Sequence, residues 1–188
     1  MSKVVIAGDA SGTGTFTISA PNGNTDRTLV LPDEAGTVLT TAGVPASAMP
    51  VGSVIQVASA LSTSITINSS SYVDVTDYNV TITPSSASNK ILVRVTPKNY
   101  MSLTSDTYPV LYSIILRNGV EIYGRAMYHY SQRAPNGYIE EDVNSVMEFL
   151  DSPNTTSPVT YKVQAKNAGS VNVTYYGGSV ITVMEIVA

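Results

Sequence analysis

The sequence contains no cysteine and no tryptophan, and His129 is its single histidine. Without cysteine the chain has no disulfides, no thiolate zinc sites and no cysteine nucleophile. Charged residues make up 13% of the 188 residues, about half of the usual share of ~25%. Much of the surface must therefore consist of uncharged polar residues or be buried against another chain. These shortages disfavour an enzyme, and we expect no cofactor.

Basic residues are scarce as well. Ten Lys and Arg against 14 Asp and Glu give a net charge of −4 at pH 7. Binding to nucleic acid normally needs a basic face, so we expect no nucleic-acid partner. Apolar runs stay well short of the ~20 residues of a membrane helix, and the N-terminal run is too short for a signal-peptide core. We therefore expect a protein that is made in the cytoplasm and does not insert into membranes.

Helix signals are nearly absent, whereas Thr, Val, Ile, Tyr and Ser dominate in short alternating runs that are typical of strands. In the second part of the chain such runs predict strands over 53–57, 64–68, 79–83, 90–96, 110–117, 120–130, 143–150, 160–164, 171–175 and 179–187. Between two of them Asn118-Gly119 predicts a type I′ hairpin turn, which needs positive φ at both central residues. The expected fold is all-β, an antiparallel sandwich and most simply a jelly roll.

The first fifty residues differ from the rest. Their short strand candidates, 3–6, 14–19, 27–31 and 37–40, hold too few large apolar residues to close a core. A linker with Pro45 and Pro50 precedes an expected boundary near Val51. We thus expect a β-structured stalk over 1–50 and a knob over 51–188, with identical chains completing one another's core. The apolar stalk residues expected at the attachment or trimer interface are Phe16, Ile18, Leu29, Leu31, Val38 and Leu39.

Candidates for chemistry are few. His129 has no identifiable nucleophile and carboxylate to form a hydrolase triad, so a packing or inter-subunit contact is favoured over catalysis. Carboxylates that could hold a cation are Asp74 and Asp77, which flank an expected turn, and Glu140 and Asp142, which share one face of an expected strand. A solvated acidic edge is favoured over a metal site there. No catalytic or metal-binding residue is nominated.

Tyrosine is abundant, with 12 Tyr against 2 Phe. A tyrosine has an apolar face and a polar tip, which suit subunit interfaces and the stacking of sugars alike. The interface role is favoured for most of them, and binding of a glycan stays open for the rest. The tyrosines singled out for either role are Tyr123, Tyr128, Tyr130, Tyr138, Tyr175 and Tyr176.

Residues 27–41, RTLVLPDEAGTVLTT, resemble a TLPDxxGTLxTT segment that recurs in bacteriophage tail fibres and related virion proteins. The second part of the chain is similar to C-terminal knob domains of phage structural proteins, many of them from phages of cyanobacteria and marine bacteria. The stretches that carry this second resemblance are 52–56, 80–93, 116–119, 149–153, 161–164 and 181–186. Each stretch is common by itself, whereas their order and spacing are specific.

The resemblance implies a homotrimer with a jelly-roll knob like that of tumour necrosis factor, on a β-structured attachment segment. Such proteins are non-enzymatic components of the virion surface, which bind the major capsid protein or tail and baseplate proteins. The chain is short for a long tail fibre, which leaves a capsid decoration (cement or head-fibre) protein or a short fibre. The alternative is a short tail fibre that recognises a carbohydrate on the host surface.

Overall fold

The computed structural model describes residues 11–15, 17, 22–24, 26, 28, 44, 48–103, 110–128, 139–143, 146–168, 173–175 and 177–188. For 99–103, 125–128, 139–143, 173 and 175 it describes the backbone alone. By the contacts between its residues the chain divides into two units, Met1–Val38 and Leu39–Ala188. No described residue belongs to a helix that is long and apolar enough to cross a membrane.

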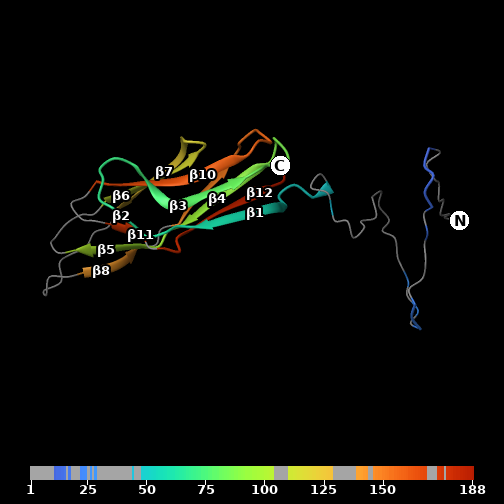
Figure 1. Cartoon of the computed structure of the whole chain (residues 1–188), viewed down its shortest axis with the longest axis horizontal. Coiled ribbons are helices and arrows are strands. Elements are labelled where there is room, and N and C mark those ends of the chain that lie inside the picture. The colour runs from blue at the N-terminus through green and yellow to red at the C-terminus, as the bar shows by residue number, and fades with distance from the viewer. Residues whose placement is uncertain are drawn as a thin grey trace. The chain divides into compact units, whose positions relative to one another are not determined.

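The described part of the chain forms strands without an α-helix, which confirms the all-β prediction (Figure 1). All the strand pairings are antiparallel. The strands are β1 (Val54–Leu61), β2 (Ile65–Ile67), β3 (Val73–Ile82), β4 (Lys90–Thr96), β5 (Asn99–Leu103), β6 (Val110–Arg117), β7 (Val120–Tyr128), β8 (Ile139–Val143), β9 (Met147–Asp151), β10 (Val159–Asn167), β11 (Val173–Tyr175) and β12 (Val180–Ile186).

Three four-stranded sheets make two layers. Their orders are β1-β12-β4-β9, β2-β11-β5-β8 and β3-β10-β6-β7. The first two sheets correspond strand by strand, because β2 follows β1, β5 follows β4, β8 precedes β9 and β11 precedes β12. Figure 1 shows β2-β11-β5-β8 at the end of the sandwich away from the C-terminus, as a continuation of the first sheet. The two sheets therefore form one long layer that faces β3-β10-β6-β7.

Strand order identifies the architecture. If each continued strand is counted once, the described part of the chain has eight strands, and their order is 1-8-3-6 in one layer and 2-7-4-5 in the other. This is the order that two Greek keys give in a jelly roll. The sandwich and jelly roll predicted from the sequence are confirmed. The homotrimer, the boundary near Val51 and the β-structured stalk remain predictions, although Gly14, Thr15 and Thr17 of the expected strand 14–19 do not lie in a strand.

Alternation along the central strands builds the core between the layers. In β4, β12 and β10 every second side chain points inward, and these side chains are removed from water, which is the main stabilising term of the fold. The fully buried hydrophobic members of these strands are Ile91, Val93, Val95, Ile181, Val183, Val159, Tyr161, Val163 and Ala165.

A polar seam, made of Ser62, Lys98, Gly178 and Ser179, lies where the long layer is interrupted. The Lys98 backbone N–H donates to Oγ of Ser179 at 2.8 Å. The Ser62 N–H donates to the Ser179 carbonyl at 2.9 Å, and the Gly178 N–H to the Ser62 carbonyl at 3.0 Å. Ser62 and Ser179 are buried. These bonds satisfy backbone groups that the strand ladder no longer pairs, which makes the interruption tolerable inside the fold.

One expectation about acidic residues is wrong. Asp74 and Asp77 do not flank a turn, since both lie within β3. The register of β3 with β10 shifts at this point, and Asp77 has a φ of 58°. Lys162 pairs with Asn79 and Gln164 with Asp74, so β3 has three more residues than β10 between these two pairs, and such an irregularity inserts extra residues into one strand. It lets Val75 and Tyr78 both point into the core, although they are three positions apart.

The Asn118-Gly119 turn joins β6 to β7 as the sequence predicts. The φ angles of Asn118 and Gly119 are 49° and 85°, and Arg117 pairs with Val120 across the turn. The Asn118 side chain also accepts a hydrogen bond from the Thr160 N–H at 2.9 Å. The turn thus fixes the hairpin and attaches it to β10.

Replacing Gly119 with Ala should lower the free energy of unfolding by about 1–2 kcal/mol, because an L-residue is strained at this φ. A Cβ added at Gly119 would meet no atom within 4 Å, so backbone strain is the only cost. Urea denaturation measures the change. The adjacent, exposed Val120→Thr variant is the control and should stay within about 0.5 kcal/mol. Equal stability of Gly119→Ala and the wild type would contradict the turn.

Candidate interaction surfaces

An apolar row crosses the outer face of β1-β12-β4-β9. The register aligns Val57 with Met184, Met184 with Leu92, and Leu92 with Leu150. The chain neighbours of Met184 and Leu92 are buried in the core, so alternation turns these two side chains outward. Met184 and Leu92 are half-buried, whereas Val57 is 59% and Leu150 46% exposed. The apolar row therefore runs from one edge of the sheet to the other and is most exposed at its two ends.

The next level of the same face is polar. Here Ser59, Thr182, Arg94 and Glu148 are aligned across the four strands. Arg94 and Glu148 lie directly opposite each other and are exposed. Two opposite charges this exposed contribute little to stability. At this level the charged residues lie on β4 and β9, and β1 and β12 carry the uncharged Ser59 and Thr182.

The edge strand β1 carries no charge at all. Its eight residues are VIQVASAL, and in the described part of the chain it pairs on one side only, with β12. Val54, Val57 and Leu61 are all large, apolar and exposed. Natural proteins usually protect an edge strand with charges, proline or a covering segment. An uncharged apolar edge is accordingly a surface that another chain can cover.

The opposite face of the sandwich carries an aromatic cluster. The Lys166 Nζ lies 4.6 Å from the ring centroid of Tyr72 and 5.0 Å from that of Tyr112. Both are cation–π contacts. Burial and the negative charge of Glu121 raise the pKa of Tyr72, so it is uncharged at neutral pH. All three cluster residues are half-buried, and they form a stacking surface on the outer side of β10 and β6.

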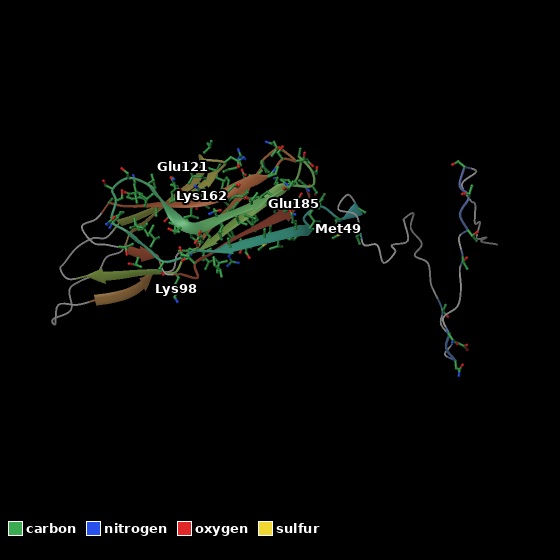
Figure 2. All side chains as sticks on the ribbon, viewed as in Figure 1. Met49, Lys98, Glu121, Lys162 and Glu185 are labelled. Atoms are coloured by element: carbon green, nitrogen blue, oxygen red, sulfur yellow. The ribbon has the colours of Figure 1, made fainter. Side chains whose placement is uncertain are left out.

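Beside this cluster a carboxylate binds two neighbouring side chains. Asp74 accepts hydrogen bonds from the Gln164 amide at 2.8 Å and from Lys162 Nζ at 2.9 Å. These bonds hold the pKa of Asp74 below its ordinary value. Figure 2 shows Lys162 and Glu121 on the same side of the sandwich. Proteins bind sugars with aromatic rings that lie next to carboxylate and amide groups. Here the Asp74 carboxylate is already hydrogen-bonded to Gln164 and Lys162.

A buried carboxylate closes one end of the sandwich. Glu185 is 1% exposed and lies near the C-terminal end of the fold (Figure 2). Its Oε1 accepts hydrogen bonds from the Ser85 N–H at 2.6 Å, the Ser85 hydroxyl at 2.8 Å and the Asn89 amide at 2.7 Å. Burial by itself raises the pKa of Glu185, but the bonds from Asn89 and Ser85 outweigh it and leave the pKa below its ordinary value. The charged carboxylate thus ties the β3–β4 loop to β12.

A second buried carboxylate lies at the same end. Asp151 accepts two hydrogen bonds from Arg117 at 2.8 and 3.0 Å and one from the Tyr161 hydroxyl at 2.7 Å. Burial, with the hydrogen bond to Asp151, raises the pKa of Tyr161, which keeps its proton and donates it to this bond. Ile91 separates Asp151 from Glu185 in the sheet. Both carboxylates are buried and accept several hydrogen bonds. Glu185 holds the β3–β4 loop to β12, and Asp151 joins β9 to β6 and β10 of the other layer.

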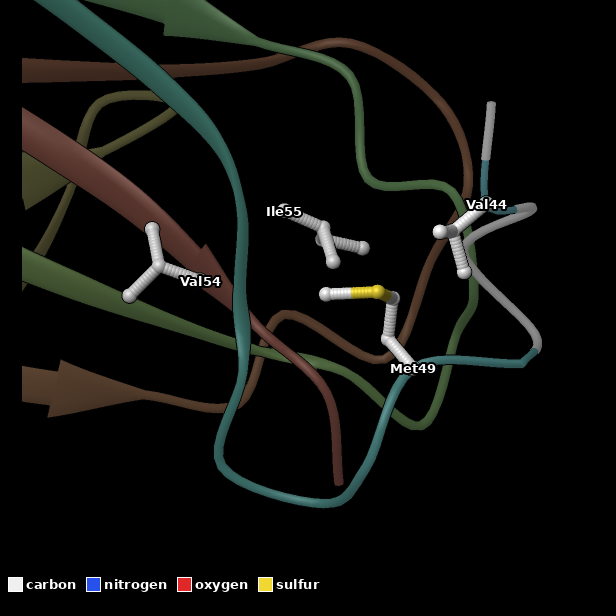
Figure 3. A pocket seen from close by; sticks show the side chains of 4 residues that line it. All are labelled: Val44, Met49, Val54 and Ile55. Carbon is white, nitrogen blue, oxygen red and sulfur yellow. The ribbon is translucent and has the colours of Figure 1, made fainter. Parts of the chain in front are cut away.

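A pocket of about 320 Å³ lies at the start of β1 and is lined by Val44, Met49, Val54 and Ile55. Figure 3 shows these four side chains. The four described lining residues are all apolar. Small-molecule sites usually combine an apolar lining with a few convergent polar groups. Its described lining residues include no such polar group, and the pocket continues the apolar surface of β1.

The sequence-predicted site residues are only partly covered by the described structure. Of the tyrosines, Tyr123 has a described side chain, and its ring stacks on Phe149 at a centroid distance of 5.5 Å. That contact lies within the chain and packs against the core. Tyr128 and Tyr175 lie in β7 and β11, where the structure gives the backbone alone. Outside the described residues lie Tyr130, Tyr138, Tyr176, Phe16, Ile18, Leu29, Leu31, Val38 and Leu39.

The other chemical candidates are also left open. His129 lies outside the described residues, and Glu140 and Asp142 lie in β8 with the backbone alone described. Among the residues whose side chains are described, no group of three or more His, Asp or Glu could hold a metal ion.

Sequence reasoning missed the apolar row and the cluster of Tyr72, Tyr112 and Lys166. Tyr72 precedes β3, and the other residues stand at outward positions of alternating strands, which is a signal for exposure. The signal does not say which exposed residues of different strands lie side by side, because that depends on sheet order and register.

Comparisons with known proteins assign no family. No family model matches the chain, and no curated protein matches it. Among solved structures, that of the infectious bursal disease virus Gt strain matches 71% of this chain at 14% sequence identity, with a TM-score of 0.36. The VP2 subviral particle of that virus matches 70% of the chain at 11% sequence identity, with a TM-score of 0.34. Dimeric latent PorU from Porphyromonas gingivalis covers 73% at 10% identity with 0.32. The chain spans 38% and 40% of the two viral proteins and 14% of PorU.

Replacing Glu185 with Gln should lower the free energy of unfolding at pH 7 by about 1–3 kcal/mol, since a buried charged acceptor is lost. Because the folded-state pKa lies below the ordinary 4.5, the stabilisation is complete above that pH and is lost as pH falls through the folded pKa. Urea unfolding between pH 7 and pH 3 should show a steeper acid loss for the wild type than for Glu185→Gln.

The control for this prediction is Glu148→Gln on the exposed outer face. It should leave the free energy of unfolding within about 0.5 kcal/mol of the wild type at neutral pH. Identical acid profiles for the wild type and Glu185→Gln would show that the Glu185 network does not exist.

Proposed function

We propose that this chain is a non-enzymatic structural protein of a bacteriophage virion. Residues 51–188 form a knob that projects from the particle surface, and residues 1–50 attach it to the major capsid protein or to tail or baseplate proteins. The protein works as a homotrimer, either as a capsid decoration (cement or head-fibre) protein or as a short fibre.

The observation that carries this proposal is the jelly-roll order of the strands between Val54 and Ile186. It is the fold implied by the resemblance of residues 51–188 to phage knob domains. This part of the chain follows the stretch 27–41, which resembles a segment of phage tail fibres. Jelly rolls form viral capsid and lectin domains. A fold alone does not assign a function, so the proposal depends on the fold and the sequence resemblance together.

The surfaces support an assembly role. The two buried carboxylates hold parts of the sandwich together, and the apolar side chains exposed on β1 and β9 favour contact with another protein. In a trimer each weak contact with the particle is made three times, so the effective concentration raises the overall affinity without strong single contacts.

A second candidate function is favoured by the aromatic cluster. Tyr72, Tyr112 and Lys166 lie beside Asp74 and Gln164 on an outer face. Stacking surfaces next to hydrogen-bonding groups suit a carbohydrate. Under this alternative the protein is a short tail fibre that binds a glycan on the host surface.

Light scattering behind size exclusion should give a mass of about 60 kDa, three copies of the 19.8 kDa chain. The reason is that an uncharged apolar edge and a stalk poor in apolar residues are stable only when another copy covers them. A mass of about 20 kDa at micromolar concentration would contradict the homotrimer.

Full-length protein with Leu29→Asp and Leu31→Asp should no longer join virions, because the charges disrupt the apolar contacts proposed for the attachment segment. Mass spectrometry of purified particles measures incorporation, expected to fall at least tenfold. Thr28→Ser is the matched control. Wild-type levels of the double variant in particles would overturn the attachment role of residues 1–50.

A glycan array and binding to whole host cells distinguish the two candidate functions. A decoration protein should bind neither, which is the result we expect. Binding that drops at least tenfold in Tyr72→Ala or Tyr112→Ala, and not in the exposed Val120→Thr, would replace the leading proposal with the receptor-binding one.

A further inference from the structure

The apolar row ends at both edges of one sheet, and its ends are its most exposed members. Val57 on β1 is 59% exposed, and Leu150 on β9 is 46% exposed. Among the described residues, β1 and β9 each pair on a single side. Each copy of the chain therefore has two separate sheet edges that each carry an exposed apolar side chain, at the same level along the strands.

The direction of the strands makes these edges complementary. Every pairing in the sheet is antiparallel, so β1 and β9, which are three places apart, run in opposite directions. Rotation about an axis parallel to the strands changes neither the direction of a strand nor the level of a residue. It brings β1 of one copy beside β9 of the next in antiparallel orientation, as in an ordinary sheet.

The side chains at each level also match. At the level of the apolar row, Val57 of one copy meets Leu150 of the next. At the polar level, the Ser59 hydroxyl meets the Glu148 carboxylate, to which it can donate a hydrogen bond. Because β1 carries no charge, it brings neither a like charge against Glu148 nor a charge that would be buried without a partner.

We infer that the β1 edge of one copy binds the β9 edge of the next, so that the partner for this surface is another copy of the chain. The contact is heterologous, since two different edges meet, and it closes into a ring. This inference rests on the proposed homotrimer and assigns the residues that hold it together. In the ring Val57 and Leu150 cover each other, and the apolar row becomes continuous between copies.

The absence of cysteine provides a direct test. Full-length protein carrying Val57→Cys and Leu150→Cys is oxidised and run on a denaturing gel without reductant. Within one copy β12 and β4 separate the two positions, a distance of about 14 Å, and a disulfide needs Cα atoms within about 7 Å. Any disulfide therefore joins two copies, and we expect a covalent trimer of about 60 kDa as the main product.

Single variants and a matched pair serve as controls. Neither Val57→Cys alone nor Leu150→Cys alone should cross-link. The pair Val57→Cys with Val120→Cys should not cross-link either, although Val120 is 65% exposed, because it lies in the other layer. A covalent dimer from Val57→Cys alone would show that β1 meets β1 and would overturn the inference. A dimer as the end product of the double variant would exclude the ring.

A pair of opposite charges placed at the two edges gives a second test of the inference, and this test needs no oxidation. Val57→Lys should raise the dissociation constant of the trimer at least tenfold, and adding Leu150→Glu should restore most of the loss, because the new charges meet across the interface. If the wild type has trimer mass, but no cross-link forms and Leu150→Glu rescues nothing, the inference fails while the homotrimer stands. If the wild type is a monomer, the homotrimer itself fails.

Discussion

Strict alternation along β4 and β12 determines both faces of the first layer at once. Ile91, Val93 and Val183 are fully buried between the layers, so Leu92 and Met184 have to point outward. The antiparallel register then aligns them with apolar residues on both edge strands. The same alternation therefore determines the core and the outer surface. A shift of the strand register by one residue would turn the core side chains outward and the outer side chains inward.

Most of the fold could be predicted from local pattern. The strands at 90–96 and 110–117 have the bounds that were expected, and Asn118-Gly119 forms the expected turn. The strand β5 was missed, and β8 was expected only as the short strand that places Glu140 and Asp142 on one face, because Asn99–Leu103 and Ile139–Val143 show little apolar alternation. Their strand structure depends on continuing the ladders of β4 and β9, which is a tertiary effect that short sequence windows do not contain.

The candidate sites were harder to predict than the fold. Density of tyrosine along the chain suggested Tyr123, whose ring stacks on Phe149 and packs against the core. The half-buried aromatic cluster on the outer face uses the more isolated Tyr72 and Tyr112. Density of acidic residues likewise did not point to Glu185, which is isolated in sequence and buried. Contacts across a sheet join positions that are tens of residues apart, and only the register reveals them.

The pairing of the first strand with the last has a mechanical consequence. β1 starts directly after the segment proposed to anchor the chain, and it pairs along its length with β12, from Leu61 opposite Val180 to Val54 opposite Ile186. In an antiparallel ladder the hydrogen bonds lie perpendicular to the strands. Tension that enters at Val54 and runs along β1 therefore loads these bonds together in shear instead of opening them one by one. A knob pulled by its anchor would resist extraction most strongly along the strand axis.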